Sequence, residues 1–355
     1  MTLSPSSSDP QSLQVEIGEL LNHLPNMKHG ELIQRALMTL VRMAEVEADR
    51  LDWKILNSSL QDMEQAFRVF YPYRHIRKIS IFGSARTKPD APEYQMAADF
   101  ARCVTQLGFM VMTGGGPGIM QAGNEGAGLE KSFGLNIQLP FEQGSNPFIE
   151  GDPKLINFKY FFTRKLFFLR ESDALALFPG GFGTQDEAFE CLTLMQTGKA
   201  DPLPLVLVDP PGGDYWKNWE IYQKDHLLKA GWINEDDLHL YTLTDRVDEA
   251  CEAIASFYRV FHSSRYVGEN LILLLKCEPS EEIIDYLNQK YSRLLVKGKI
   301  LRGTVLPQEI GSETEHLARL ILHFNQRDLG LLYQLIRDLN RLVEPAPEVI
   351  HPEQK

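Results

Sequence analysis

The chain has 355 residues, 43% of them hydrophobic and 24% charged, which is enough apolar material for a sizeable globular core. Its formal net charge of -12 argues against a sequence-independent nucleic-acid binder, because such proteins need a basic surface to replace phosphate counterions. No apolar run approaches the roughly 18 residues of a membrane span, and the N-terminus lacks a basic segment followed by an apolar core. We therefore expect a cytoplasmic protein with neither a membrane nor a nucleic acid as partner.

The four cysteines are far apart and form no CxxC pair. This spacing suggests neither a zinc site nor a disulfide framework, so we expect reduced, mostly buried thiols. They are Cys103, Cys191, Cys251 and Cys277.

The N-terminal part is expected to be a tail followed by helices. Residues 1–12 are rich in Ser, Pro and Asp, which is typical of a disordered tail. Residues 13–74 form a helical extension, since apolar side chains recur at spacings of three and four in 13–24 and from 31 to about 70.

Residues 75–264 show a different pattern, in which short apolar runs alternate with segments of helical length. The pattern predicts a parallel sheet covered by helices on both faces, a Rossmann-like doubly wound α/β fold. The expected strands are 79–82, 109–112, 133–139, 155–160, 174–178 and 203–208, and the expected helices are 91–107, 118–129, 161–170, 184–197, 215–228 and 247–261.

Residues 265–343 are predicted to form a small α+β domain, followed by a tail at 344–355. Strands are expected at 270–276, 299–306 and 318–324, and helices at 280–295 and 327–342.

Three glycine-rich turns follow the first, second and fifth of the expected strands: Gly83-Ser84-Ala85-Arg86, Thr113-Gly114-Gly115-Gly116-Pro117-Gly118 and Pro179-Gly180-Gly181-Phe182-Gly183-Thr184. One such turn is often only a tight turn, but three at one sheet edge predict an anion cradle of backbone N–H groups and helix N-termini. None is a Walker A motif or a complete GxGxxG fingerprint, which disfavours an ATPase or a dinucleotide dehydrogenase.

Glu187 lies one turn inside the helix that should begin after the third turn, with Thr184 as the expected N-cap. Acidic residues in a first turn commonly just complement the helix dipole. If the cradle holds a phosphate, however, Glu187 would flank the sugar of a bound nucleotide. There a carboxylate could stabilise oxocarbenium-like charge or orient an attacking water.

Arg164 and Lys165 interrupt an otherwise aromatic and apolar helical segment. Basic side chains in such a helix often only extend to the surface. Because Arg164 precedes the cradle strand, its planar guanidinium could also contact a phosphate or Glu187.

These motifs resemble the LOG family, the cytokinin-activating phosphoribohydrolases that were long named as lysine decarboxylases. PGGFGTQDE at 179–187 is similar to the family's PGGxGTxxE signature, Arg164-Lys165 to its RK pair, and TGGGPGIMQAGNEGA at 113–127 to its second glycine motif. The likeness covers roughly residues 75–262, whereas the helical extension and the C-terminal domain are absent from the family's short members.

The resemblance implies hydrolysis of a nucleoside 5'-monophosphate to free base and ribose 5-phosphate, by at least a dimer, without metal or cofactor. It assigns Arg164 and Glu187 as the catalytic pair, and Phe161-Phe162-Thr163 replaces the usual lead before the RK pair, so AMP or another purine monophosphate is as good a candidate substrate as a cytokinin nucleotide. The substrate-binding residues are expected to be Ser84, Gly115, Gly116, Lys165, Gly180, Gly181, Gly183 and Thr184.

Two other functions share part of this sequence pattern or of the family's former name. A non-catalytic module that senses a nucleotide or carries molybdenum cofactor fits the same cradle, although the presence of both Arg164 and Glu187 favours an enzyme. A lysine decarboxylase would need pyridoxal phosphate on a Schiff-base lysine, and no segment resembles such a site.

Overall fold

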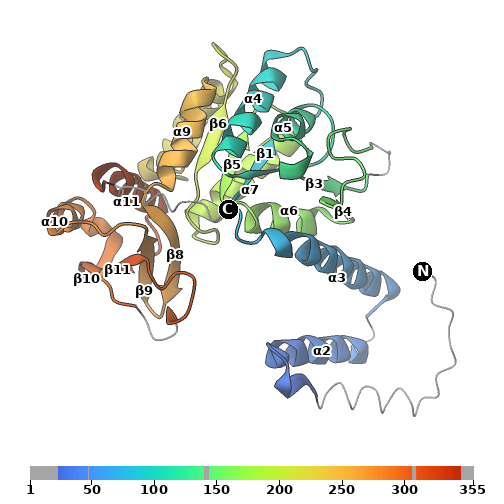
Figure 1. Ribbon diagram of the computed structural model, residues 1–355, viewed down its shortest axis with the longest axis horizontal. Coiled ribbons are helices and arrows are strands. Elements are labelled where there is room, and N and C mark those ends of the chain that lie inside the picture. The colour runs from blue at the N-terminus through green and yellow to red at the C-terminus, as the bar shows by residue number, and fades with distance from the viewer. Residues whose placement is uncertain (1–22, 47, 140–143, 306–308, 345–355) are drawn as a thin grey trace, which may run out of the picture. The chain divides into compact units, whose positions relative to one another are not determined.

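A computed structural model describes residues 23–46, 48–139, 144–305 and 309–344 of the chain (Figure 1). The chain divides into two compact units, Met1–Gln61 and Asp62–Lys355, which are treated separately below. The expected tail at 1–12, the expected tail at 344–355 apart from its first residue, and nearly all of the expected helix at 13–24 lie outside the described residues.

The first unit is helical. It contains a short 3-10 turn (Leu24–Asn26), helix α2 (Gly30–Glu45) and the beginning of α3 (Arg50–Phe70). The predicted helical extension is thus confirmed, with a break between the two helices. Several apolar side chains of α2 are exposed within this unit, among them Leu32, Met38 and Val41.

The second unit is built on a seven-stranded sheet in which every pair of neighbouring strands is parallel. Its order, β4-β3-β2-β1-β5-β6-β7, confirms the Rossmann-like doubly wound fold. The strands are β1 (Lys78–Phe82), β2 (Met110–Thr113), β3 (Ser132–Ile137), β4 (Leu155–Phe158), β5 (Ala174–Leu177), β6 (Leu205–Val208) and β7 (Tyr241–Thr244). The sequence did not predict β7, because this edge strand is short and half of its residues are threonine.

The chain leaves β1 in one direction as far as β4 and then returns to build β5, β6 and β7 on the other side of β1. Right-handed crossovers place the helices of these two halves on opposite faces of the sheet. The first face carries α4 (Pro92–Gln106) and α5 (Ile119–Ala127), and α9 (Val247–Phe257) packs beside α4. The second half contributes α6 (Phe161–Arg170), α7 (Phe182–Gln196) and α8 (Tyr215–Tyr222), which a π-helical turn extends over Gln223–Leu228.

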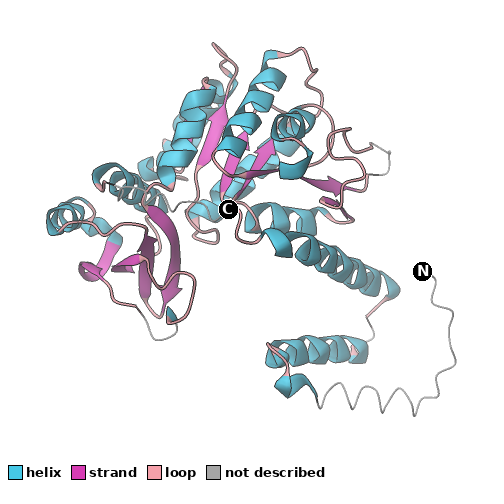
Figure 2. Cartoon of the chain, in the orientation of Figure 1, coloured by secondary structure: helices cyan, strands magenta, loops and turns pink. Residues whose placement is uncertain are grey.

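The C-terminal domain is a four-stranded antiparallel sheet with two helices (Figure 2). It consists of β8 (Phe261–Val267), β9 (Asn270–Leu275), α10 (Glu281–Lys290), β10 (Leu295–Arg302), β11 (Ala318–Phe324) and α11 (Leu329–Leu342), in the sheet order β10-β11-β9-β8. The expected α+β class is confirmed, but β8 was not predicted because its FHSSRYV sequence is largely polar. The expected boundary at residue 264 consequently falls inside β8. Short 3-10 turns complete the fold at Tyr71–Tyr73, Leu129–Lys131, Glu235–His239 and Ser292–Leu294.

The C-terminal domain and the seven-stranded sheet share one core, because α11 packs against α9, α7 and the 3-10 turn Glu235–His239. Tyr333 of α11 is buried, and its hydroxyl accepts a hydrogen bond from the backbone N–H of Leu203 (3.1 Å) just before β6. Asn340, also buried, accepts from the backbone N–H groups of Val260 and Phe261, where β8 begins. The last helix therefore fastens the small sheet to the large one.

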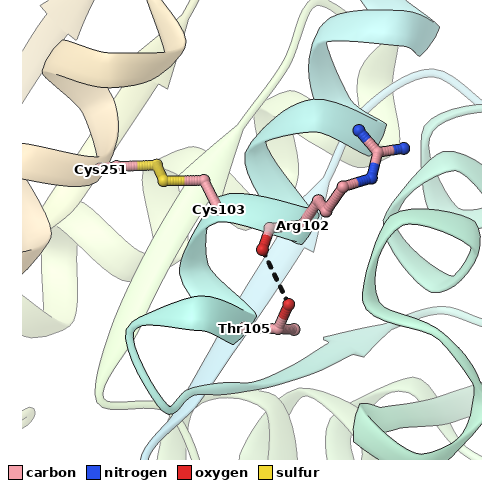
Figure 3. The surroundings of a disulfide bond; sticks show 4 residues. All are labelled: Arg102, Cys103, Thr105 and Cys251. Atoms are coloured by element: carbon pink, nitrogen blue, oxygen red, sulfur yellow. Dashed lines mark hydrogen bonds between the residues drawn. A yellow bond between two sulfur atoms is a disulfide. The ribbon is translucent and has the colours of Figure 1, made fainter.

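A disulfide joins Cys103 of α4 to Cys251 of α9, with their Cα atoms 6.7 Å apart (Figure 3). The expectation of reduced thiols is wrong for these two residues. They are separated by 148 positions in the sequence and become neighbours only because α4 and α9 pack side by side. Cys191 is a buried thiol, as expected, and burial raises its pKa.

Candidate active site

A cleft of about 860 Å³ opens at the carboxyl edge of the large sheet, where β1 lies between β2 and β5. This is the point at which the strand order reverses, and open α/β sheets commonly bind ligands there. The three glycine-rich turns, which follow β1, β2 and β5, all contribute to the lining of the cleft. The expected meeting of these turns is therefore confirmed.

Backbone hydrogen bonds connect the three turns to one another. The N–H of Ser84 donates to the carbonyl of Pro179 (3.1 Å), and the N–H of Ile119 donates to the carbonyl of Ser84 (3.0 Å). Gly118 has a φ of 69°, and a Cβ at this position would lie 2.3 Å from the Ser84 oxygen. Only glycine permits this approach, so the first and second turns can pack as one cradle.

A buried polar network holds the second turn from behind. The backbone N–H of Asn146 donates to the carbonyl of Gly115 (2.7 Å), and its side-chain amide donates to the carbonyl of Gly116 (3.0 Å) and to Asn124 Oδ1 (2.9 Å). Thr113 also donates to Asn124 Oδ1 (2.7 Å) and accepts from the N–H of Gly115 (3.0 Å). These satisfied groups fix the turn without using its surface toward the cleft. No sequence motif predicted this role for Asn146.

The third turn leads into α7, whose N-cap is Gly181 and not Thr184. Thr184 is instead the third residue of the helix, is buried, and packs so closely on Gly180 that a Cβ there would lie 2.1 Å from its Oγ1. From α8, the Tyr215 hydroxyl donates to the carbonyl of Gly180 and accepts from the side chain of Gln185. The first N–H groups of a helix have no partner within it, and at the start of α7 those of Phe182 and Gly183 lie at the cleft, whereas the N–H of Thr184 donates to the carbonyl of Gly181 (3.0 Å).

Arg164 lines the cleft from α6. Its Nε donates to the carbonyl of Leu135 at the end of β3 (2.7 Å), and its guanidinium lies 5.1 Å from the centre of the Phe168 ring. Burial lowers the pKa of Arg164 to about 10, while the charge of Glu187 acts in the opposite direction. The guanidinium of Arg164 is thus a part-buried cation held in position at the cleft.

Asp62, from the part of α3 that belongs to the second unit, holds the beginning of α6. Its carboxylate accepts from the backbone N–H groups of Lys159 (3.1 Å) and Tyr160 (3.4 Å) and from the hydroxyl of Thr163 (2.7 Å). An acidic group at a helix N-terminus satisfies free donors and complements the dipole. Asp62 therefore orients the helix that carries Arg164, a role that the sequence did not reveal.

Glu187 faces the same cleft from α7, and its side chain is only 12% exposed. Burial raises its pKa to about 7, although the nearby Lys165 and Arg164 lower it. A carboxyl group with a pKa near neutrality can take up and release a proton at physiological pH, which is what acid–base catalysis requires.

Lys165 points toward the carboxylates of α7. Its Nζ lies 2.8 Å from Asp186 and 3.7 Å from Glu187, and it also bonds Glu190. Burial opposes its charge, but the bonds to Asp186 and Glu190 raise the pKa of Lys165 above its usual range. The positive charge of Lys165 consequently lies where it attracts the carboxylate of Glu187.

Most of the predicted site residues come together around one space. Ser84, Gly116, Gly180, Gly181, Gly183 and Thr184 line the cleft with Arg164 and Glu187, whereas Gly115 and Lys165 lie outside this lining. The cleft also has an apolar wall that includes Met120, Ile137, Phe161 and Phe182. The sequence analysis assigned none of these four a role in the site, because apolar residues near strand ends do not differ from core residues in a single sequence.

The arrangement defines a Rossmann-like α/β protein in which three glycine-rich turns, the part-buried Arg164 and Glu187 meet at the switch point of the sheet. No group of three or more His, Cys, Asp or Glu side chains in the described ranges is arranged to hold a metal ion. Within those same ranges, no helix is long and apolar enough to cross a membrane.

Two comparisons with known proteins find related sequences. A family model described as "Possible lysine decarboxylase" matches residues 112–254. A stretch of 93 residues is 34% identical to the cytokinin riboside 5'-monophosphate phosphoribohydrolase of Mycobacterium tuberculosis, and the match spans 26% of this chain and 47% of that relative. Both comparisons confirm the resemblance to the LOG family.

Solved structures resemble about half of the chain. The molybdenum cofactor binding protein of Rippkaea orientalis aligns with 51% of this chain and 96% of its own, at 17% identity and a TM-score of 0.38. The molybdenum cofactor carrier protein of Chlamydomonas reinhardtii aligns with 50% and 96%, at 20% identity and a TM-score of 0.35. Likeness at this level carries no functional conclusion.

Proposed function

We propose that the protein hydrolyses the N-glycosidic bond of a purine nucleoside 5'-monophosphate. The observation that carries the proposal is the position of Glu187, a largely buried carboxyl group with a pKa of about 7, at a cleft that is also lined by three glycine-rich turns. The 5'-phosphate would lie against the glycine turns and the N-terminus of α7. The relative from M. tuberculosis supports the same reaction class.

In the proposed reaction, water attacks C1' of the ribose and the C–N bond breaks, its electron pair leaving on the base nitrogen. Ionised Glu187 stabilises the positive charge that develops on the sugar and accepts a proton from the water. The departing base nitrogen takes up one proton from solvent and Glu187 returns its proton to solvent, so nucleotide and water give the neutral base and ribose 5-phosphate. Arg164 supports the substrate's phosphate or sugar oxygens as a fixed donor.

The test is direct. The purified full chain is incubated with AMP, GMP, IMP and isopentenyladenosine monophosphate, and free base and ribose 5-phosphate are measured by chromatography. We expect release from at least one purine nucleotide, and release that is at least about 100-fold slower with the Glu187→Gln variant. Tight nucleotide binding by calorimetry without any released base would refute hydrolysis and favour a nucleotide-sensing or cofactor-carrying module.

A decarboxylase is not supported by the lining of the cleft. Pyridoxal phosphate needs a lysine amine for its Schiff base. The described residues that line the cleft include no lysine, and the ammonium of nearby Lys165 is bonded to Asp186 and Glu190. We expect purified protein mixed with pyridoxal phosphate to show no Schiff-base absorbance that depends on Lys165.

We further propose that the active form is a cytoplasmic homodimer. Large apolar side chains are exposed on α6 and α7 next to the cleft, among them Phe162, Leu166 and Phe189, and exposed apolar clusters commonly mark interaction surfaces. Light scattering coupled to size exclusion should give twice the monomer mass. Leu166→Glu should shift that mass toward the monomer, and a monomeric wild-type chain would refute the dimer.

A further inference from the structure

A second cavity, of about 380 Å³, lies between α9, β7 and α11, away from the residues of the candidate active site. We call it the arginine pocket, because its lining includes Arg259, Arg337 and Arg341. Only one carboxylate, that of Glu252, is in the same lining, in a chain whose net charge is -12. The residues that line the pocket thus carry more positive than negative charge, whereas the chain as a whole is negatively charged.

Arg337 is the central group of the pocket. Its Nη2 donates to Thr242 Oγ1 (3.2 Å) and to the carbonyl of Tyr241 (3.5 Å), and both acceptors are neutral. It forms no ion pair with any residue that the structure describes, and burial lowers its pKa. A part-buried cation that lacks an opposite charge is unfavourable until an anion supplies one.

The other two arginines of the lining are paired with carboxylates. Arg259 pairs with Glu252 (2.8 Å) and Arg341 with Asp338 (2.9 Å). The Arg259–Glu252 pair is exposed on both sides, and exposed ion pairs are weak, so Arg259 can exchange its carboxylate for a ligand oxygen at little cost. Asp338 is buried, but it also bonds Lys290 and Tyr291, so it keeps partners when the exposed guanidinium of Arg341 turns to a ligand.

We propose that the arginine pocket binds a small multivalent oxyanion, one that carries phosphate or carboxylate groups. The planar guanidinium fork fits two oxygens of either group, and the hydroxyls of Thr242 and Ser256 offer neutral donors beside it. The volume is at the small end of ligand pockets, which suits a compact metabolite. The pocket walls come from both the large sheet domain and α11, so a bound anion stabilises the attachment of the C-terminal domain.

The proposal is independent of the hydrolase activity, because its readouts are binding and thermal stability. Titration calorimetry on the full chain uses inorganic phosphate, pyrophosphate, succinate and citrate, with chloride as the reference. We expect at least one to bind and to raise Tm by about 5 °C at a hundredfold excess over Kd. The arms with phosphates and with carboxylates distinguish the two sources of oxyanion.

The variant Arg337→Gln should weaken binding about tenfold to a hundredfold, since it removes a charged donor. Arg327→Gln, which makes the same charge change at an exposed position outside the pocket, should leave binding unchanged. Should Arg337→Gln fail to fold, Ser256→Glu offers a second route: its carboxylate should abolish anion binding and raise the Tm of the unliganded chain.

Three results would overturn the proposal. The first is that none of the four anions binds at millimolar concentration. The second is that Arg337→Gln or Ser256→Glu binds as tightly as the wild type. The third concerns phosphate, which can also occupy the candidate active site: binding that is lost in Arg164→Gln but kept in Arg337→Gln belongs to the cleft.

Discussion

Replacing Glu187 with Gln tests the electrostatics of the site and its chemistry together. The pKa of this carboxyl group rises from 4.5 to about 7 on folding, mainly through burial and in spite of Lys165 and Arg164. The folded protein therefore binds a proton more tightly than the unfolded chain. Ionised Glu187 destabilises the fold, and this effect is absent below pH 4.5, grows between pH 4.5 and 7, and is complete above about pH 7.

A shift of this size corresponds to about 3 kcal/mol at pH 8. Glutamine keeps the shape of the protonated acid without its charge. We expect Glu187→Gln to raise the free energy of unfolding by up to about 3 kcal/mol at pH 8 and by less than about 1 kcal/mol at pH 5. Turnover should fall by about 10²–10⁴-fold at the same time, the usual loss for a missing acid–base group.

Urea denaturation at pH 5, 6.5 and 8 measures the stability, and release of free base from AMP measures the turnover. Glu190→Gln is the matched control on the same helix, because it removes a more exposed carboxylate that bonds Lys165 and should not stabilise the fold at pH 8. Equal free energies of unfolding of Glu187→Gln and wild type at pH 8 would show that ionised Glu187 does not destabilise the fold. Full activity of the variant would remove Glu187 from the mechanism.

Three further substitutions test how the site is held in place. Asp62→Ala should lower the free energy of unfolding by about 1–2 kcal/mol, as measured by thermal unfolding. It should also reduce kcat, because Arg164 would be misplaced. An unchanged kcat would show that the contacts of Asp62 do not matter for catalysis. Tyr215→Phe removes the hydrogen bond to the Gly180 carbonyl, so KM for the nucleotide should rise about tenfold in steady-state kinetics; an unchanged KM would show that the turn does not depend on it. Gly180→Ala places a methyl group 2.1 Å from Thr184 Oγ1, and calorimetry should detect no nucleotide binding, whereas binding at wild-type affinity would contradict the role of this turn.

The sequence was sufficient for the architecture of the large sheet. Apolar runs that end in glycine and alternate with helical segments can bury both faces only in a parallel sheet, and β1 to β6 lie where the pattern predicted. The same logic placed the glycine turns, Arg164 and Glu187 around one cleft, because the carboxyl ends of parallel strands share an edge. Two strands were missed, β7 and β8, since their partly polar residues do not give the apolar signal of a central strand.

Only the tertiary structure shows which groups meet when they are far apart in the sequence. Asp62 caps a helix about 97 residues away, Asn146 supports a turn 30 residues before it, and Cys103 meets Cys251 across 148 residues. Such pairs follow no local spacing rule, so no sequence motif predicts them. The pKa of Glu187 is of the same kind: its identity and its place on a helix can be read from the sequence, but its proton affinity depends on the burial that the completed fold imposes.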